Sequence, residues 1–136
     1  MKNQLVALCL GFMTIGTFAQ KDELKDAEKA IKGGDFKGAL AIIESLSSME
    51  DTMDDKYKAQ YYFLKGEAYG TRDVKKAAEA YNKLTAFEKQ IGKQKYTKEA
   101  EPKLNNLLTF VSVEQSRSTF LTFYTKNYGL QKLTSP

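Results

Sequence analysis

The chain has 136 residues, of which 42% are hydrophobic and 28% are charged. This is the length of one domain with a modest core, and the composition excludes wholesale disorder. The formal net charge is +4 and nearly all basic residues are Lys, whereas proteins that read bases or clamp phosphates favour Arg. Nucleic-acid binding is therefore not expected.

Residues 1–19 have the pattern of a secretory signal peptide. Lys2 gives a positive start, Leu5–Phe18 is an apolar run, and Ala19 completes a small-residue cleavage motif. The alternatives are an uncleaved anchor or a buried helix, but Leu5–Phe18 is shorter than the ~20 residues that span a bilayer. We expect cleavage after Ala19 and an exported protein, periplasmic or secreted, with no stable membrane span. Cleavage would remove Cys9, the one cysteine, and the sequence has no His.

Two helices are predicted between residues 22 and 46. The first covers residues 22–33 and ends at Gly33-Gly34, because glycine readily takes the left-handed conformation found at helix ends. Asp35 is the expected N-cap of the second helix, where its side chain would accept a hydrogen bond from a free backbone N–H. Ser47–Asp55 then follows as a polar connection. The apolar stripe of the second helix consists of Phe36, Ala39, Leu40, Ile43 and Leu46.

Two further helices are predicted between Asp54 and Gly92. The third helix covers about Asp54–Tyr69, and its two neighbouring apolar faces predict a helix that is covered on two sides. Gly70 ends this helix, Asp73 caps the fourth, and Gly92 ends the fourth. The stripe expected to be buried on the fourth helix is Val74, Ala77, Ala78, Tyr81, Leu84 and Ile91.

The two helix pairs resemble each other in sequence. Gly34–Ile43 aligns with Arg72–Tyr81 at the capping Asp, at a Lys two positions later and at an Ala on the buried stripe. Because the match includes the caps as well as the core positions, we interpret the pairs as two copies of one unit. A plain helical bundle without repeats is the alternative, since it would space apolar residues in the same way.

Tyr62–Tyr81 is the most informative stretch. It places Gly66 three residues before Tyr69, and Ala77 four residues before Tyr81. This spacing resembles a tetratricopeptide repeat of the degenerate kind seen in exported bacterial proteins, with its pattern aromatic-x₂-L-G-x₂-Y followed by A-x₃-F. The resemblance implies an all-α fold of antiparallel helix pairs stacked as a short solenoid, with repeats at about residues 21–48 and 54–92. It implies close packing between helices at Ala27, Ala39, Gly66, Tyr69, Ala77 and Tyr81.

The same resemblance implies a binding groove along the first helix of each pair. Its expected lining residues are Lys21, Leu24, Glu28, Gln60, Phe63 and Glu67. These residues differ from the Lys and Asn with which the family clamps carboxylates, so an acidic peptide tail is not the expected ligand. The alternative for Leu24 and Phe63 is that they pack against a neighbouring helix.

A further helix is predicted at about residues 97–113, with Pro102 in its first turns or at a kink. From residue 114 the Thr, Ser, Phe and Tyr content favours strand at least as much as helix, and we expect residues 114–136 to form an irregular tail that docks on this helix. The aromatic residues from Phe110 onward could instead contact a partner or a second copy of the chain. The aromatic residues concerned are Phe110, Phe120, Phe123, Tyr124 and Tyr128.

No motif in the chain indicates catalysis, a cofactor or a metal site. Asp51, Asp54 and Asp55 form a carboxylate cluster, but acidic residues are common where helices begin. The sequence therefore predicts a non-catalytic scaffold that binds a peptide or protein outside the cytoplasm. The alternatives are a structural helical bundle or envelope-complex subunit without a groove, and a small hydrolase that uses carboxylates.

Overall fold

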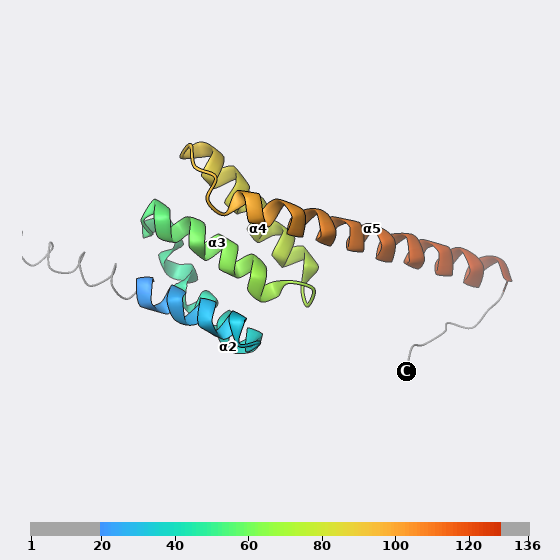
Figure 1. Cartoon of the computed structure of the whole chain (residues 1–136). Helices are drawn as coiled ribbons and strands as arrows, with labels where there is room; N and C mark the ends of the chain where they lie inside the picture. The colour runs from blue at the N-terminus through green and yellow to red at the C-terminus, as the bar shows by residue number, and fades with distance from the viewer. Residues whose placement is uncertain (1–19, 129–136) are drawn as a thin grey trace, which may run out of the picture.

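The computed structural model describes residues 20–128, and every regular element in that range is a helix (Figure 1). A first helical segment over residues 20–32 is followed by α2 (Phe36–Ser45), the 3₁₀ helix η1 (Leu46–Thr52), α3 (Asp55–Tyr69), α4 (Val74–Gln90) and α5 (Thr97–Tyr128). The all-α prediction is confirmed. The predicted signal peptide and the last eight residues of the predicted tail lie outside the described residues.

The helix ends follow local sequence, as predicted. The Asp35 side chain accepts a hydrogen bond from the Gly38 backbone N–H at 2.9 Å, and that of Asp73 accepts one from Lys76 at 3.1 Å. Gly70 ends α3 with φ of 45°, a region that side chains with a Cβ rarely adopt. These caps satisfy donors that would otherwise lack a partner, each contributing about 1 kcal/mol.

The connection between α2 and α3 differs from the prediction. Most of it is the 3₁₀ helix η1, where the hydroxyls of Ser47 and Thr52 donate to backbone carbonyls three residues earlier. Asp54 is the N-cap of α3 by position, but its side chain makes no capping hydrogen bond. Asp54 and Asp55 thus lie where α3 begins, as acidic residues often do, but Asp54 caps the helix by position alone.

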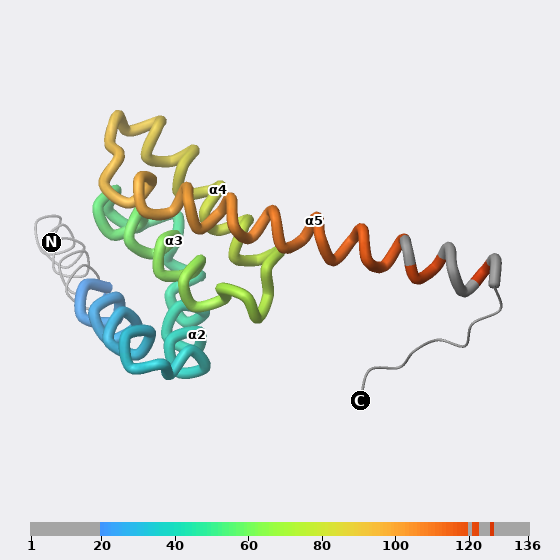
Figure 2. The backbone as a smooth tube through the Cα atoms, turned by 45° about the vertical axis from the view of Figure 1, so that its right-hand side comes forward, coloured from blue at the N-terminus to red at the C-terminus, as the bar shows by residue number. Residues whose placement is uncertain are grey.

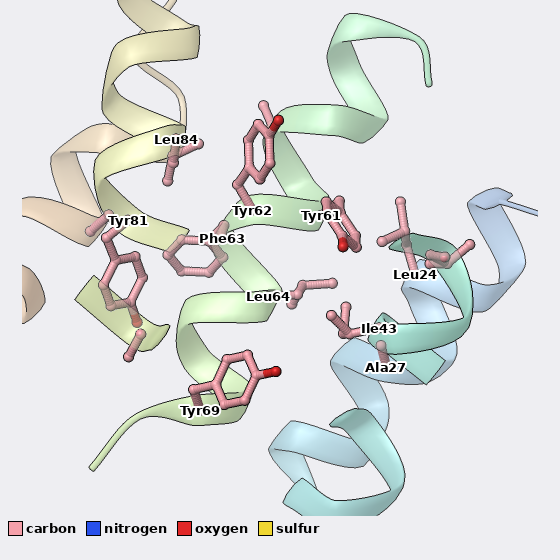
Figure 3. Close-up of a cluster of buried hydrophobic side chains, with 14 of the residues drawn as sticks. Leu24, Ala27, Ile43, Tyr61, Tyr62, Phe63, Leu64, Tyr69, Tyr81 and Leu84 are labelled. Carbon is pink, nitrogen blue, oxygen red and sulfur yellow. The ribbon is translucent and has the colours of Figure 1, made fainter. Parts of the chain in front are cut away.

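Helix α3 is the centre of the packed body. Four consecutive side chains, Tyr61 to Leu64, are all buried, which is possible only if the helix is covered on two sides. Figure 3 shows Ile43 of α2 and Leu24 of the first segment on one side of α3, with Leu84 of α4 on the other. The prediction of an inner helix with two covered faces is confirmed. Burying a side chain the size of Ile43 or Leu84 stabilises the fold by about 1.5–3 kcal/mol.

Gly66 allows α3 and α4 to approach closely. A Cβ at this position would lie 2.4 Å from a ring carbon of Tyr81 on α4, so only glycine leaves room for the ring in its present place. The two helices run antiparallel: Tyr81, midway along α4, packs at Gly66, while Phe87, later in α4, meets Tyr62, earlier in α3, with ring centroids 6.0 Å apart. The close approach predicted between Gly66 and the fourth helix is therefore present.

Two tyrosine–glutamate hydrogen bonds link α3 to the helices that precede it. Tyr62 donates to Glu50 of η1 at 2.8 Å, and Tyr69 donates to Glu44 of α2. The hydrogen bond to Glu44, together with burial, raises the pKa of Tyr69 to about 12. Hydrogen bonds to an ionised acceptor are about twice as strong as neutral ones. These contacts therefore link the middle and the C-terminal end of α3 to the preceding helices.

Helix α5 has a docked part and a projecting part. Ala100 and Leu107 belong to the buried core, whereas Phe110 and Val113 are exposed. Figures 1 and 2 show α5 continuing well beyond the body. We call residues 108–128 the outer part of α5. No helix within residues 20–128 is long and apolar enough to cross a membrane.

The prediction of an irregular tail from residue 114 is wrong up to Tyr128, because this stretch continues α5. The strand propensity of these residues does not produce a strand, because no other strand exists among residues 20–128 with which they could pair. Pro102 lies inside α5, near its N-terminal end, where the missing N–H removes one bond of the helical ladder.

Candidate functional site

A hollow of about 500 Å³ lies where three helical elements meet. Glu28, Ile31 and Lys32 line it from the first segment. The α3 lining residues are Gln60, Phe63, Leu64 and Glu67, and the residues at the start of α5 and just before it are Lys95, Tyr96 and Glu99. The hollow is thus shared by helices that are not consecutive, with α2 and α4 contributing none of these residues.

The floor of the hollow is aromatic. The rings of Phe63 and Tyr96 are stacked, with centroids 5.2 Å apart and an angle of 27° between their planes. The Tyr81 ring also contacts Phe63, with ring centroids 6.3 Å apart. Offset stacking of this kind stabilises the pair by about 0.5–1.5 kcal/mol beyond the burial of area. The floor is therefore a firm apolar surface.

Glu88 holds the segment that brings Tyr96 into the floor. Its carboxylate is 1% exposed and accepts hydrogen bonds from the backbone N–H groups of Lys95, Tyr96 and Thr97 at 2.8–3.1 Å. Burial by itself raises the pKa of a carboxyl, but here these N–H donors outweigh it and hold the pKa of Glu88 below its usual value. The ionised Glu88 side chain therefore holds in place the backbone that leads into α5.

One edge of the hollow carries a network of charges. Lys103 lies 2.8 Å from a carboxylate oxygen of Glu67 and 3.1 Å from one of Glu99. Burial would lower the pKa of Lys103, but hydrogen bonds to these two carboxylates raise it above its usual value. Tyr81 donates its hydroxyl to the other oxygen of Glu67. Burial and this hydrogen bond both raise the pKa of Tyr81, so the hydroxyl keeps its proton.

Two other lysines of the lining, Lys32 and Lys95, are exposed. Lys32 forms an ion pair with Glu28 at 2.6 Å one turn apart, with side chains 73% and 40% exposed. The Lys95 ammonium lies 4.7 Å from the centroid of the Tyr96 ring, within range of a cation–π interaction. Exposed pairs of this kind contribute at most about 1 kcal/mol to stability, so these side chains can be displaced by a ligand at small cost.

Four of the six predicted groove residues line the hollow: Glu28, Gln60, Phe63 and Glu67. The placement of Leu24 in a groove is wrong, because this side chain is fully buried against the core. Lys21 is exposed but does not line the hollow. The packing alternative therefore holds for Leu24, whereas Phe63 both packs against its neighbours and lines the hollow. All six residues expected to pack between helices are buried: Ala27, Ala39, Gly66, Tyr69, Ala77 and Tyr81.

Sequence reasoning missed the contribution of Lys95, Tyr96 and Glu99. They enter the hollow because Glu88 anchors the preceding turn, and this is a tertiary effect. One signal was available: Glu88 follows Tyr81 and Leu84 at helical spacing, which places a carboxylate on the buried stripe of α4. A buried carboxylate requires hydrogen-bond donors, and the nearest candidates were the backbone N–H groups of the next helix start.

The hollow combines an apolar floor with polar and charged edges, which suits non-covalent binding of a chain segment or small molecule. Within residues 20–128, no group of three or more His, Cys, Asp or Glu residues is placed to hold a metal ion. Asp51, Asp54 and Asp55 are all exposed and lie outside the hollow. The residues gathered here can therefore recognise a ligand by shape, apolar contact and charge.

No protein-family model, curated protein sequence or solved structure matches the chain. The likeness to tetratricopeptide repeats is thus one of motif spacing, at Gly66, Tyr69, Ala77 and Tyr81. The hollow and the residues that line it are the basis for assigning a function.

Proposed function

We propose that this protein is a non-catalytic interaction scaffold, and that its hollow binds a peptide or an extended segment of another protein. The observation that carries the proposal is the stacked Phe63–Tyr96 floor at the base of a hollow of about 500 Å³ shared by three helices. A volume of this size accommodates a few side chains of a bound segment. Location outside the cytoplasm is part of the proposal and rests on the sequence of residues 1–19.

The proposal interprets the helix pairs as degenerate tetratricopeptide-like repeats stacked as a short solenoid. Three observations support this: the capped turns at Asp35 and Asp73, the close contact of Gly66 with Tyr81, and the hollow along the first helix of each pair. In stacked helix pairs, the first helices line a concave surface that is used for binding. A groove at this place is what such an arrangement would produce.

The lining residues indicate the chemistry of the ligand. An apolar or aromatic side chain would stack over Phe63 and Tyr96, because large apolar anchors supply most of the affinity at such sites. Glu28 pairs with Lys32, and both Glu67 and Glu99 pair with Lys103, so the rim of the hollow has no excess of either charge. The expected ligand is therefore an extended segment with a large apolar side chain and little net charge.

A substitution that fills the hollow with a larger side chain tests whether peptides bind there. Random peptides displayed on phage would be selected against the purified full-length protein, and the affinity of the enriched peptides would then be measured for two variants. Gln60→Trp places an indole in the hollow, whereas Gln90→Trp makes the same change at an exposed position at the end of α4. We expect Gln60→Trp to weaken binding at least about tenfold, a change of ~1.4 kcal/mol, and Gln90→Trp to leave it unchanged.

Two outcomes contradict the proposal: no enrichment of apolar-anchored peptides, or equal affinity of the two variants for the enriched peptides. Circular dichroism of both variants establishes that the fold is retained. Failure of binding would favour the second candidate, a subunit of a larger complex without a peptide groove. One observation favours that candidate independently, namely the exposed apolar side chains on the outer part of α5.

A further inference from the structure

The outer part of α5 has a stripe of side chains whose spacing alternates between three and four residues. Leu107, Phe110, Glu114, Arg117 and Leu121 occupy successive positions of this stripe. A spacing that averages 3.5 residues keeps side chains on one helix face along a partner helix, as in coiled coils. The stripe starts in the core, where Leu107 is buried, and continues outward along the helix to residues that are exposed. The core-packing face of α5 thus extends beyond the body that covers it.

The charges in the stripe match those of a second copy placed antiparallel. With the two helices centred between residues 115 and 116, Glu114 of each copy faces Arg117 of the other, and Phe110 faces Leu121. A parallel pair in register would instead place Glu114 opposite Glu114 and Arg117 opposite Arg117. Like charges facing each other disfavour that arrangement. The stripe is therefore self-complementary in one orientation, as a two-fold interface requires.

The position of α5 in the fold supports the same arrangement. Helices α3 and α4 form an antiparallel pair, whereas α5 is docked on α4 at its start and has no following helix in residues 20–128. A single helix that exposes Phe110, Val111 and Val113 would be stabilised by a neighbour that covers them. An α5 from a second copy supplies a helix of equal length to each partner.

We propose that the protein forms a homodimer through the outer part of α5, with the two helices antiparallel and with reciprocal Glu114–Arg117 ion pairs at the centre. Within one helix these two side chains already form an exposed ion pair at 3.8 Å, and in the dimer each also meets its opposite charge on the other copy. The interface is separate from the hollow and does not depend on peptide binding. A lipid surface is a weaker candidate for this face, because residues 108–128 carry only two basic groups, Arg117 and Lys126.

Charge reversal tests the dimer. Sedimentation equilibrium would be measured for the full-length chain and for Glu114→Arg and Arg117→Glu, each of which places like charges at both central contacts. We expect each variant alone to weaken self-association at least about tenfold, because like charges then face each other across the interface. An equimolar mixture of the two should associate again, because the two central arginines of one variant then face the two central glutamates of the other. Recovery in the mixture also shows that the single variants are folded.

Glu101→Arg is the matched control, since it makes the same charge change on the opposite, exposed face of α5 and should leave association unchanged. The proposal is overturned if neither reversal weakens association, if Glu101→Arg weakens it equally, or if the unaltered chain is monomeric at high micromolar concentration. A heterologous partner or a lipid surface would give that monomeric result.

Orientation is tested by cross-linking in the chain with Cys9→Ser, which then contains no cysteine. A mixture of Phe110→Cys and Leu121→Cys chains should form disulfide-linked dimers between the two variants. Phe110→Cys alone should not, because residue 110 lies far from its counterpart in an antiparallel pair. Disulfide formation by Phe110→Cys alone would contradict the antiparallel arrangement.

Discussion

The packed body of the protein and the outer part of α5 are both helical, yet they are held in different ways. In the body, α3 is covered on two sides, and side chains such as Tyr61 and Leu84 are fully buried. In the outer part, Phe110 and Val113 are 50% and 59% exposed. The helix persists across this boundary because helical hydrogen bonds are local, whereas burial depends on a neighbour. Helical structure and a completed core are therefore separate properties of this chain.

Aromatic truncation in the two regions should show the largest contrast. Tyr81→Ala removes a ring that is 2% exposed and fills the space left by Gly66, so we expect the free energy of unfolding to fall by ~3–5 kcal/mol. Phe110→Ala, measured at a concentration where the chain is monomeric, should change it by less than about 0.5 kcal/mol. Urea denaturation followed by circular dichroism compares the two, and equal losses would contradict the distinction between body and outer helix.

The start of α5 belongs to the body because Glu88 holds it there. Glu88→Gln removes the charge that faces three backbone N–H groups, and we expect a loss of ~2–3 kcal/mol in the free energy of unfolding. The matched change Glu101→Gln, on the exposed face of α5, should have almost no effect.

The contribution of Glu88 to stability should also disappear on acidification. Its pKa is lowered in the fold, so stability present above the usual carboxyl pKa is lost as the pH falls through the folded value. This role would be contradicted if the difference in the free energy of unfolding between the unaltered chain and Glu88→Gln did not shrink as the pH falls.

Sequence was sufficient for features set by local chemistry. The caps at Asp35 and Asp73 and the left-handed Gly70 follow from residues within one turn, and each was predicted correctly. The buried face of α3 also followed from its pattern of apolar residues.

Features that depend on distant contacts could not be predicted in this way. Leu24 has the spacing of a groove residue, but α3 covers that side of the first segment and buries it. Tyr96 lies in a connecting segment, and only the fold shows that Glu88 draws it under the hollow. The helix beyond residue 114 was missed because strand propensity has no effect where no strand offers hydrogen bonds.

Adding a single methyl group at Gly66 should have a smaller effect than removing Tyr81. In Gly66→Ala the new Cβ would overlap the Tyr81 ring, and we expect a loss of ~1–3 kcal/mol as the ring shifts. Gly33→Ala is the control, since its added Cβ would lie no closer than 3.4 Å to any atom outside its own chain neighbours. Differential scanning calorimetry of both variants makes the comparison, and an unchanged melting temperature for Gly66→Ala would contradict the close approach of α3 and α4.

The smallest effect concerns the Tyr69–Glu44 contact, and it is visible at high pH. The pKa of Tyr69 is raised to about 12 in the fold, against about 10 in an unfolded chain. Between these values the unfolded chain loses the proton and the folded chain keeps it, so the free energy of unfolding falls as the pH rises from about 10 to 12. Tyr69→Phe should cost ~1 kcal/mol near neutral pH and should lessen the fall at high pH. An identical alkaline profile for Tyr69→Phe would count against this contact.

Hydrogen–deuterium exchange of the full-length protein, with and without a peptide selected by display, is the strongest test of peptide binding in the hollow. We expect the peptide to slow exchange in three separate stretches, residues 28–32, 60–67 and 95–99, while residues 108–119 are unaffected. Slower exchange confined to the outer part of α5, or no change in the three stretches that line the hollow, would contradict it.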